Sequence, residues 1–242
     1  MSEETLSVLY RPMWEEDRET LDCFRCVPKL ANGSDDSNKG PDLLRSQEDA
    51  PNTTIARNLF VLNQAAKAVT DSVHRGEPVR MIIPISSFCL LNHEIATELV
   101  RIFKETPEEI RARMIFEIFD FPQRLTVDAL DDITIPILPF FDERIARPAP
   151  QITDFTIFAN INYTGVGIDL RDQKWPLEKI EPILKTFCGA AQHSRLKAYA
   201  QGVSNHAIGK LAVNCGIAGV DGDFMVRDTE EPKPVVNTET LN

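Results

Sequence analysis

The sequence predicts an α/β protein in which short strands and helices alternate to form a (β/α) barrel. About eight apolar strands follow one another over most of the chain, and helical patterns separate most of them. With 43% apolar residues among 242, the chain can bury a substantial core as one barrel or as two smaller domains. An open, doubly wound sheet is the alternative to a closed barrel.

The N-terminal part predicts two strands and a long polar loop. Residues 6–12 and 21–27 are apolar strands on either side of the charged turn WEEDRET. Residues 29–53 are rich in Gly, Asp, Ser, Asn and Pro, a composition typical of a solvated loop. A loop of this length inside a compact domain is often functional.

The clearest helix covers residues 55–73, where apolar side chains recur at steps of three and four. Thr53 or Thr54 would cap its start, and Gly76 would end it. Strands and helices then alternate up to residue 222. The expected strands are 79–86, 113–119, 143–149, 164–170, 196–201 and 216–222, and the expected helices are 91–103, one starting at 106–109, one after Thr126, 153–160, 176–188 and 204–213, the last capped by Ser204.

Charge and composition limit the classes of partner. The net charge of −11 repels phosphate backbones and anionic lipid headgroups, so nucleic acids and membrane surfaces are not expected as partners. No apolar run reaches the ~18 residues of a spanning helix, and no signal-peptide pattern is present, so we expect a cytoplasmic protein. Residues 225–242 are polar, acidic and contain proline, which predicts a disordered tail.

The cysteines and histidines do not form a recognisable reactive site. The five cysteines are scattered within apolar stretches, which favours buried, reduced thiols over a disulfide framework. Cys23 and Cys26 form a lone C-x-x-C pair, whereas a zinc site would need a second pair. The four histidines combine into neither a His-x-x-x-His pair nor a Ser-His-Asp arrangement. No metal or cofactor is therefore expected.

Several short motifs fall at or near the predicted strand ends, among them VLYRPM, FEIFD, GID and AQGVSN. In order and spacing they resemble the EAL domain, the bacterial cyclic-di-GMP phosphodiesterase. The first looks like the family's Tyr-Gln-Pro-Ile strand, with Tyr10 and Pro12 kept, and the last resembles Ala-Glu-Gly-Val-Glu-Thr. The resemblance covers residues 6–224. It implies that residues 1–224 form a TIM-like (β/α)8 barrel of the EAL type, whose first strand could be antiparallel.

The same resemblance implies that the catalytic motifs are lost. In the family, carboxylates and an asparagine at strand ends hold two divalent cations that activate water. Only Glu117 and Asp169 match that cluster. Arg25 stands in place of the glutamate of the Glu-Ala-Leu motif. The other positions that correspond to the family's active site hold Pro84, Ala146, Arg147, Gly167, Gln201, Ser204 and Asp221, with Gly167 in place of the catalytic lysine.

Two interpretations of Arg25 and Arg147 stay open at this point. They could form a metal-free site for a phosphate or another anion, because guanidinium groups bind such groups in a bidentate way. Alternatively, they could pair with Glu117 and Asp169 and fill the emptied site with ion pairs. We favour ion pairs, because unpaired acids at a barrel mouth would repel one another. In both cases fixed positive charge disfavours a metal cation.

The resulting hypothesis is a catalytically inactive EAL-like domain that serves as a bacterial signalling or scaffold module through protein–protein interaction. The acidic surface fits a protein partner with a basic face. The alternative is a non-hydrolysing receptor for cyclic-di-GMP or another nucleotide or anion, although the lost motifs speak against cyclic-di-GMP. An enzyme with replaced chemistry ranks lowest, because the motifs supply no nucleophile with a base. The sequence leaves a homodimer open.

Overall fold

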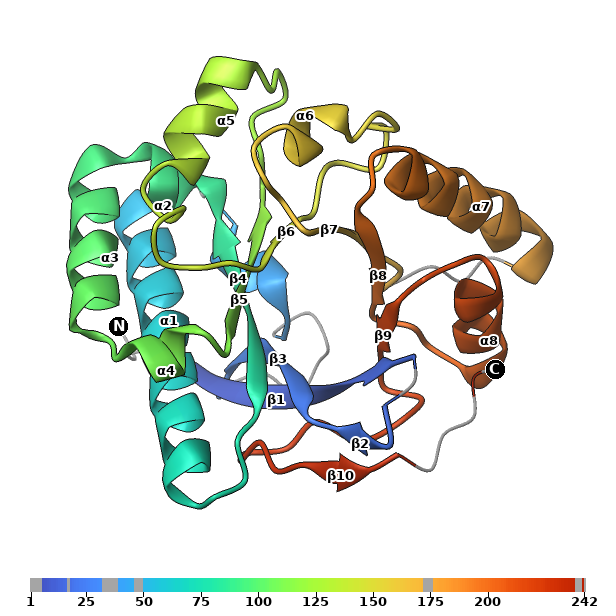
Figure 1. The fold of residues 1–242 in the computed structure, drawn as a ribbon, viewed down its shortest axis with the longest axis horizontal. Helices are drawn as coiled ribbons and strands as arrows, with labels where there is room; N and C mark the ends of the chain where they lie inside the picture. Colours follow the sequence, from blue (N-terminus) through green and yellow to red (C-terminus); the bar gives the residue numbers. More distant parts are fainter. Residues whose placement is uncertain are drawn as a thin grey trace.

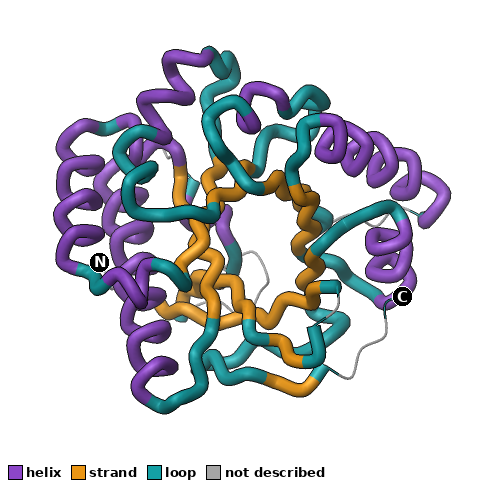
Figure 2. The backbone as a smooth tube through the Cα atoms, viewed as in Figure 1, coloured by secondary structure: helices purple, strands orange, loops and turns teal. Residues whose placement is uncertain are grey.

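The computed structural model describes residues 6–16, 18–31, 39–45, 50–171, 176–237 and 241. In these residues eight strands close into a barrel, in the order β1-β3-β4-β5-β6-β7-β8-β9. Seen along its axis, the strands form a ring and the helices lie outside it (Figures 1 and 2). The predicted closed barrel is confirmed, and the open sheet is excluded.

The first strand runs antiparallel to both of its neighbours. β1 (Leu6–Glu15) pairs with β3 (Cys23–Leu30) on one side and with β9 (Gly219–Asp221) on the other. Every pairing from β3 round to β9 is parallel. The other barrel strands are β4 (Arg80–Ser86), β5 (Met114–Phe119), β6 (Arg144–Ala146), β7 (Gly165–Asp169) and β8 (Lys197–Gln201). Each of them lies within its predicted range.

The helices cover most of the outer surface of the barrel (Figure 1). They are α1 (Pro51–His74), α2 (Ser87–Leu91), α3 (His93–Glu105), α4 (Glu108–Arg111), α5 (Val127–Thr134), α6 (Thr156–Ala159), α7 (Leu177–His193) and α8 (His206–Asn214). The helix α5 begins after Thr126 as expected, and Thr126 caps it, because its hydroxyl accepts the Ala129 N–H at 3.2 Å. Within the described part of the chain, none of the helices has the length and apolar character needed to cross a membrane.

The predicted cap of α8 is wrong. Asn205, and not Ser204, caps α8, since Asn205 Oδ1 accepts the Ile208 N–H at 3.0 Å. The helix begins at His206, so the hydroxyl of Ser204 lies one residue too early to reach the first free N–H groups. Ser204 is exposed.

The barrel interior is built in two layers, because alternate residues of a strand face the same side. The lower layer is an apolar cluster of Met13, Cys23, Ile82, Ile115, Ile145 and Tyr199. The ring of Tyr199 occupies space that a side chain at Gly219 would need, since a Cβ there would lie 2.8 Å from it. Two residues further along, the same strands carry charged or polar side chains at Arg25, Glu117, Arg147 and Gln201. The apolar layer therefore closes the barrel below a polar layer at its mouth.

Cys23 and Cys26 lie on opposite faces of β3. Cys23 belongs to the apolar cluster inside the barrel, and Cys26 belongs to the core between the barrel and its helices. Both thiols are free, and burial raises the pKa of each. Two side chains three residues apart on one strand cannot converge on one ion, so the structure fits the interpretation of this C-x-x-C pair as packed thiols.

The predicted polar loop 29–53 is shorter than expected at both ends. β3 continues to Leu30, and α1 begins at Pro51, earlier than the predicted cap at Thr53 or Thr54, because proline suits the first helical turn. Between them a 3-10 turn spans Pro41–Leu44. Residues 32–38 and 46–49 of this loop lie outside the described residues.

The C-terminal tail was expected to be disordered, but its described residues 225–237 lie against the barrel. β10 (Val235–Val236) pairs antiparallel with β2 (Thr20–Leu21), and Thr229 and Tyr10 exchange backbone hydrogen bonds of 2.8 and 2.9 Å. In Figure 1 these segments run along the side of the barrel next to β1. Backbone pairing and ion pairs with distant segments order residues 225–237. The polar composition of the tail does not reveal these contacts, so it did not predict the order.

Asp228 fixes the tail to the barrel mouth. Its side chain is only 4% exposed, Arg11 Nε donates to its Oδ1 at 2.7 Å, and Lys39 Nζ contacts its Oδ2. Burial raises the pKa of Asp228, but Arg11 and Lys39 outweigh this effect and hold the pKa below its ordinary value. The ionised carboxylate is therefore the form that stabilises the folded protein.

We predict that Asp228→Asn lowers the free energy of unfolding by about 2 kcal/mol at neutral pH, because Arg11 loses its buried partner. The contribution of Asp228 is present above the unfolded pKa of about 3.9 and disappears as the pH falls through the lower folded value. The variant should therefore lose less stability than the wild type on acidification. Urea denaturation followed by circular dichroism at several pH values measures both effects.

Glu231→Gln is the matched control, because Glu231 lies in the same tail but is exposed, and its contact is with exposed Lys233. This variant should retain the wild-type stability. Equal stability of Asp228→Asn and the wild type would contradict a docked tail.

Candidate functional site

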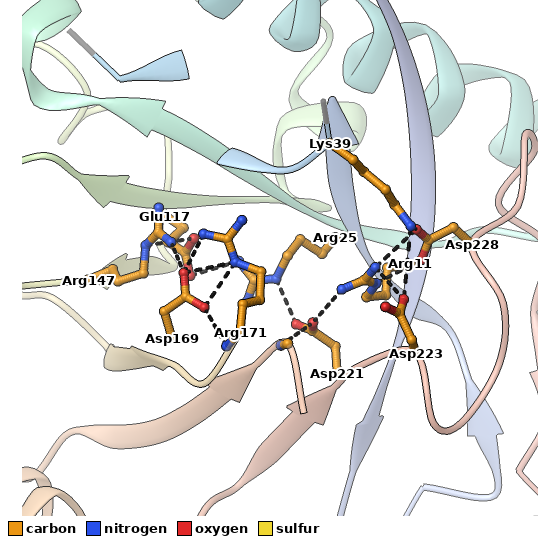
Figure 3. Close-up of polar contacts among 11 residues, drawn as sticks. Arg11, Arg25, Lys39, Glu117, Arg147, Asp169, Arg171, Asp221, Asp223 and Asp228 are labelled. Carbon is orange, nitrogen blue, oxygen red and sulfur yellow. Dashed lines mark hydrogen bonds and ion pairs between the residues drawn. The ribbon is translucent and has the colours of Figure 1, made fainter. Parts of the chain in front are cut away.

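The polar layer at the barrel mouth brings together the residues on which the sequence hypotheses rest. Parallel strands end at the same rim, so side chains from β5, β6, β7, β8 and β9 meet there, and β3 adds Arg25. Figure 3 shows Arg25, Glu117, Arg147, Asp169 and Asp221 turned toward one another. We call these five side chains the mouth cluster. All of them are buried except Asp169, whose side chain is 24% exposed.

Arg25 stands at the centre of the mouth cluster. Its Nη1 lies 2.7 Å from Glu117 Oε1, and its Nε donates to Asp221 Oδ2 at 2.7 Å. The side chains of Glu117 and Asp221 are completely buried, and that of Arg25 is 4% exposed. Burial lowers the pKa of Arg25, but the two carboxylates outweigh this effect and raise it. The guanidinium therefore stays charged and joins β3 to β5 and β9.

Arg147 contacts the two acids that were matched to the family cluster. Its Nη1 donates to Asp169 Oδ2 at 3.0 Å, and its Nε lies 3.6 Å from Glu117 Oε2. The guanidinium also lies over the ring of Phe119, 4.4 Å from its centre. Glu117 is thus placed between two guanidinium groups. Of the two interpretations of Arg25 and Arg147, this geometry agrees with ion pairs to Glu117 and Asp169.

Arg171 is a member of the site that the sequence patterns missed. Its guanidinium donates to both carboxylate oxygens of Asp169, and Nη2 also donates to Asp42 Oδ2 at 2.9 Å. Burial raises the pKa of Asp169, but Arg171 and Arg147 outweigh it and lower the pKa. The available signal was its position two residues beyond Asp169, where the chain leaves β7 at the rim. Arg171 joins the 39–45 segment to the barrel mouth.

Gly202 is required by the same arginine. Its φ of +69° is in the left-handed region, and a Cβ at this position would lie 2.0 Å from Arg171 Cγ. The Gly202 N–H also donates to Asp221 Oδ1 at 3.3 Å. The glycine of the AQGVSN turn therefore has a structural reason in this chain, since the side chain of Arg171 packs directly on it.

The remaining predicted positions divide into two groups. Gly167 and Gln201 face the mouth cluster: a Cβ on Gly167 would lie 3.3 Å from Glu117 Oε1, and Gln201 pairs in register with Asp169. Pro84 is buried in β4 and paired in register with Glu117.

Ala146 packs in the core on the helix side of the barrel, because its neighbours Ile145 and Arg147 take the inward positions. Ala146 and the exposed Ser204 therefore lie outside the cluster.

The residues of the mouth cluster do not fit a divalent cation, the group that the EAL resemblance would imply. Each of the three carboxylates already faces a guanidinium group at 2.6–3.0 Å, and a cation would meet fixed positive charge from several sides. Among the described residues, no three His, Cys, Asp or Glu side chains gather in a way that could hold a metal ion.

A pocket of about 490 Å³ opens beside the mouth cluster. It lies between the ends of β5, β6 and β7, residues 148–155 and one face of α7. Its walls are mostly apolar, and its charged lining residues are Arg45, Asp120, Arg147 and Asp169. Arg147 and Asp169 are shared with the cluster, so this pocket is an extension of the barrel mouth.

Comparison with known proteins places the fold. Neither a protein-family model nor a curated protein matches the sequence. Among solved structures, the Bacillus subtilis YkuI protein, which has an EAL domain and was solved with c-di-GMP and calcium, superposes with a TM-score of 0.70 at 13% identity. The match covers 93% of this chain and 55% of YkuI. The fold is EAL-like.

Two further structures agree over almost their whole length. An EAL domain protein from Listeria monocytogenes gives a TM-score of 0.66 at 15% identity, covering 93% of this chain and 89% of the other. The FimX EAL domain from Pseudomonas aeruginosa, solved bound to c-di-GMP, gives 0.67 at 12% identity, covering 97% and 94%. At such identities the similarity establishes the architecture and leaves the chemistry to be argued from the side chains of this chain.

We predict that Arg25→Met lowers the free energy of unfolding by about 3 kcal/mol or more, because Glu117 and Asp221 remain buried without their central cation. The matched control is Arg101→Met. Arg101 also contacts two glutamates, Glu98 and Glu105, but on the exposed surface of α3, so its replacement should leave stability nearly unchanged. Denaturant unfolding monitored by circular dichroism compares the two variants. Equal effects would contradict a special role of Arg25.

Proposed function

We propose that this chain is an EAL-fold module that does not hydrolyse cyclic-di-GMP and acts as a bacterial signalling scaffold through protein–protein interaction. The observation that carries the proposal is Arg25 between Glu117 and Asp221. Metal-dependent phosphodiester hydrolysis needs carboxylates free to coordinate cations that activate water. In this chain Glu117 and Asp169 neutralise arginines, and this pairing supports the proposal that they do not coordinate metal ions.

The alternative of a cyclic-di-GMP receptor receives less support. Arg25 and Arg147 are 3% and 6% exposed, and both already contact carboxylates. A phosphate would compete with these acids for the guanidinium groups, and an acid that it displaced would be a buried carboxylate without a partner. Arg171 is similarly paired with Asp169 and Asp42. The relatives solved with c-di-GMP make this ligand the natural one to test.

The protein surface supports a protein partner. Val127, Ile135 and Leu138 lie along α5 and the turn that follows it, with side chains 58%, 62% and 42% exposed. Exposed Asp128 and Asp132 accompany them. Apolar side chains bordered by acids fit a partner that presents apolar and basic side chains, in agreement with the net charge of −11.

The first test is calorimetric titration of the purified protein with cyclic-di-GMP, with and without Mg²⁺ or Mn²⁺, followed by analysis of the mixture for cleaved product. We expect neither heat of binding nor cleavage, because the cations of the barrel mouth are paired with its own acids. An active EAL domain assayed in parallel is the positive control. Metal-dependent cleavage would overturn the proposal, and binding without cleavage would replace it with the receptor alternative.

The second test concerns the partner. The immobilised wild-type protein is used as bait to capture a partner from a bacterial lysate. Bait with the substitution Ile135→Arg should not capture this partner, because it places a positive charge where an apolar and basic partner docks. Lys67→Glu on α1, also exposed, serves as the control and should retain that protein. The retained protein is then purified, and its direct binding to all three baits is measured by calorimetry. Unchanged affinity for Ile135→Arg would contradict a role of the α5 surface.

A further inference from the structure

The pocket beside the mouth cluster has the size of a small-molecule site, and the scaffold proposal does not involve it. We call it the α7 pocket and define it by Phe119, Ile152, Phe155, Ile183, Thr186 and Phe187, together with its charged end. Its volume of about 490 Å³ lies within the range of roughly 300–1,000 Å³ that is usual for small-molecule sites. Ile183, with 37% of its side chain exposed, stands where the pocket meets solvent. A site of this size fits a small molecule.

Four phenylalanines, Phe119, Phe121, Phe155 and Phe187, line the α7 pocket. Phe155 and Phe187 meet edge to face, with ring centres 5.2 Å apart, one from the segment before α6 and the other from α7. At the other end, Phe119 carries the guanidinium groups of Arg147 and Arg45 near its ring, at 4.4 and 5.8 Å from the centre. Rings of this kind favour a flat aromatic ligand, which can pack edge to face or offset against them.

The charged end of the α7 pocket carries equal numbers of positive and negative side chains. It holds two guanidinium groups, Arg45 and Arg147, and two carboxylates, Asp120 and Asp169. Arg45 lies 3.3 Å from Asp120, and Arg147 lies 3.0 Å from Asp169. A charged ligand would lose hydration to the apolar walls and would meet equal numbers of opposite charges, so it would gain little. An uncharged polar group can hydrogen-bond to the more exposed pair, Arg45 and Asp120, at no such cost.

We propose that the α7 pocket binds an uncharged aromatic small molecule whose hydrogen-bonding edge faces Arg45 and Asp120. This site is independent of the scaffold function, because its lining does not include the exposed side chains of α5. It also differs from an anion site at the mouth cluster, because recognition rests on the aromatic walls and on a neutral polar group.

The probe for the experiment is 6-propionyl-2-dimethylaminonaphthalene, an uncharged naphthalene with one carbonyl group, whose emission shifts to shorter wavelength in an apolar site. Titration of the full chain should give saturable binding at one site. Thr186→Trp places a large ring at the pocket wall and should raise the Kd by about tenfold or more. Lys185→Trp is the matched control, because Lys185 neighbours Thr186 on α7, points to solvent and does not line the pocket. It should bind as the wild type does.

A second variant and a second probe complete the test. Ile183→Ser removes part of an apolar wall without filling the pocket, and it should also weaken binding. The anionic 8-anilinonaphthalene-1-sulfonate should bind more weakly than the neutral probe. Wild-type affinity of Thr186→Trp, or the absence of saturable binding, would overturn the site. The anionic probe could instead bind more tightly than the neutral probe and lose this binding in Thr186→Trp. That result would overturn the assignment of an uncharged ligand. Circular dichroism confirms that each variant is folded.

Discussion

The contact between Arg25 and its two carboxylates, Glu117 and Asp221, sets the conditions for the rest of the barrel mouth. A fully buried glutamate and a fully buried aspartate are tolerable only if a cation neutralises them at short range, because the interior solvates charge poorly. Arg25 supplies that cation from β3. Since Glu117 comes from β5 and Asp221 from β9, one guanidinium connects strands from three parts of the ring. Any chemistry at the mouth has to be compatible with this arrangement.

The same requirement extends outward through further pairs. Arg147 neutralises Glu117 and Asp169 together, and Arg171 adds a second guanidinium to Asp169. Arg171 also contacts Asp42 in the 39–45 segment, and its side chain packs on Gly202. On the other side, Arg11 lies near Asp221 and pairs with Asp228, so the tail becomes part of the mouth. Segments far apart in the chain are thus held together by alternating charges (Figure 3).

The carboxylates of the mouth cluster are paired with arginines at the position where a barrel of this kind usually performs chemistry. The two binding features that we propose are the α7 pocket, which shares Arg147 and Asp169 with the mouth cluster, and the exposed apolar side chains along α5. The pocket lining does not include the exposed α5 side chains, and we propose a small aromatic molecule as the ligand of the first and a protein as the partner of the second. Under both proposals, binding by this EAL-like fold would not depend on carboxylates that coordinate a metal.

Strand and helix periodicity is a local property, so the sequence alone determined the order of strands and helices. It favoured a closed barrel over an open sheet, and the antiparallel first strand was expected only from the resemblance to the EAL domain. Periodicity predicted the eight strands and a helix after Thr126, and the resemblance to the EAL domain pointed to the candidate residues Arg25, Glu117, Arg147 and Asp169. Other features depended on contacts between distant segments. Arg171 was missed because its partner Asp42 and its packing surface at Gly202 lie far away in the chain, and Ala146 was misplaced because one residue of register decides which face of a strand points inward. The docking of the tail was likewise decided only by tertiary structure, since a polar segment is ordered by ion pairs and strand pairing that no local pattern records.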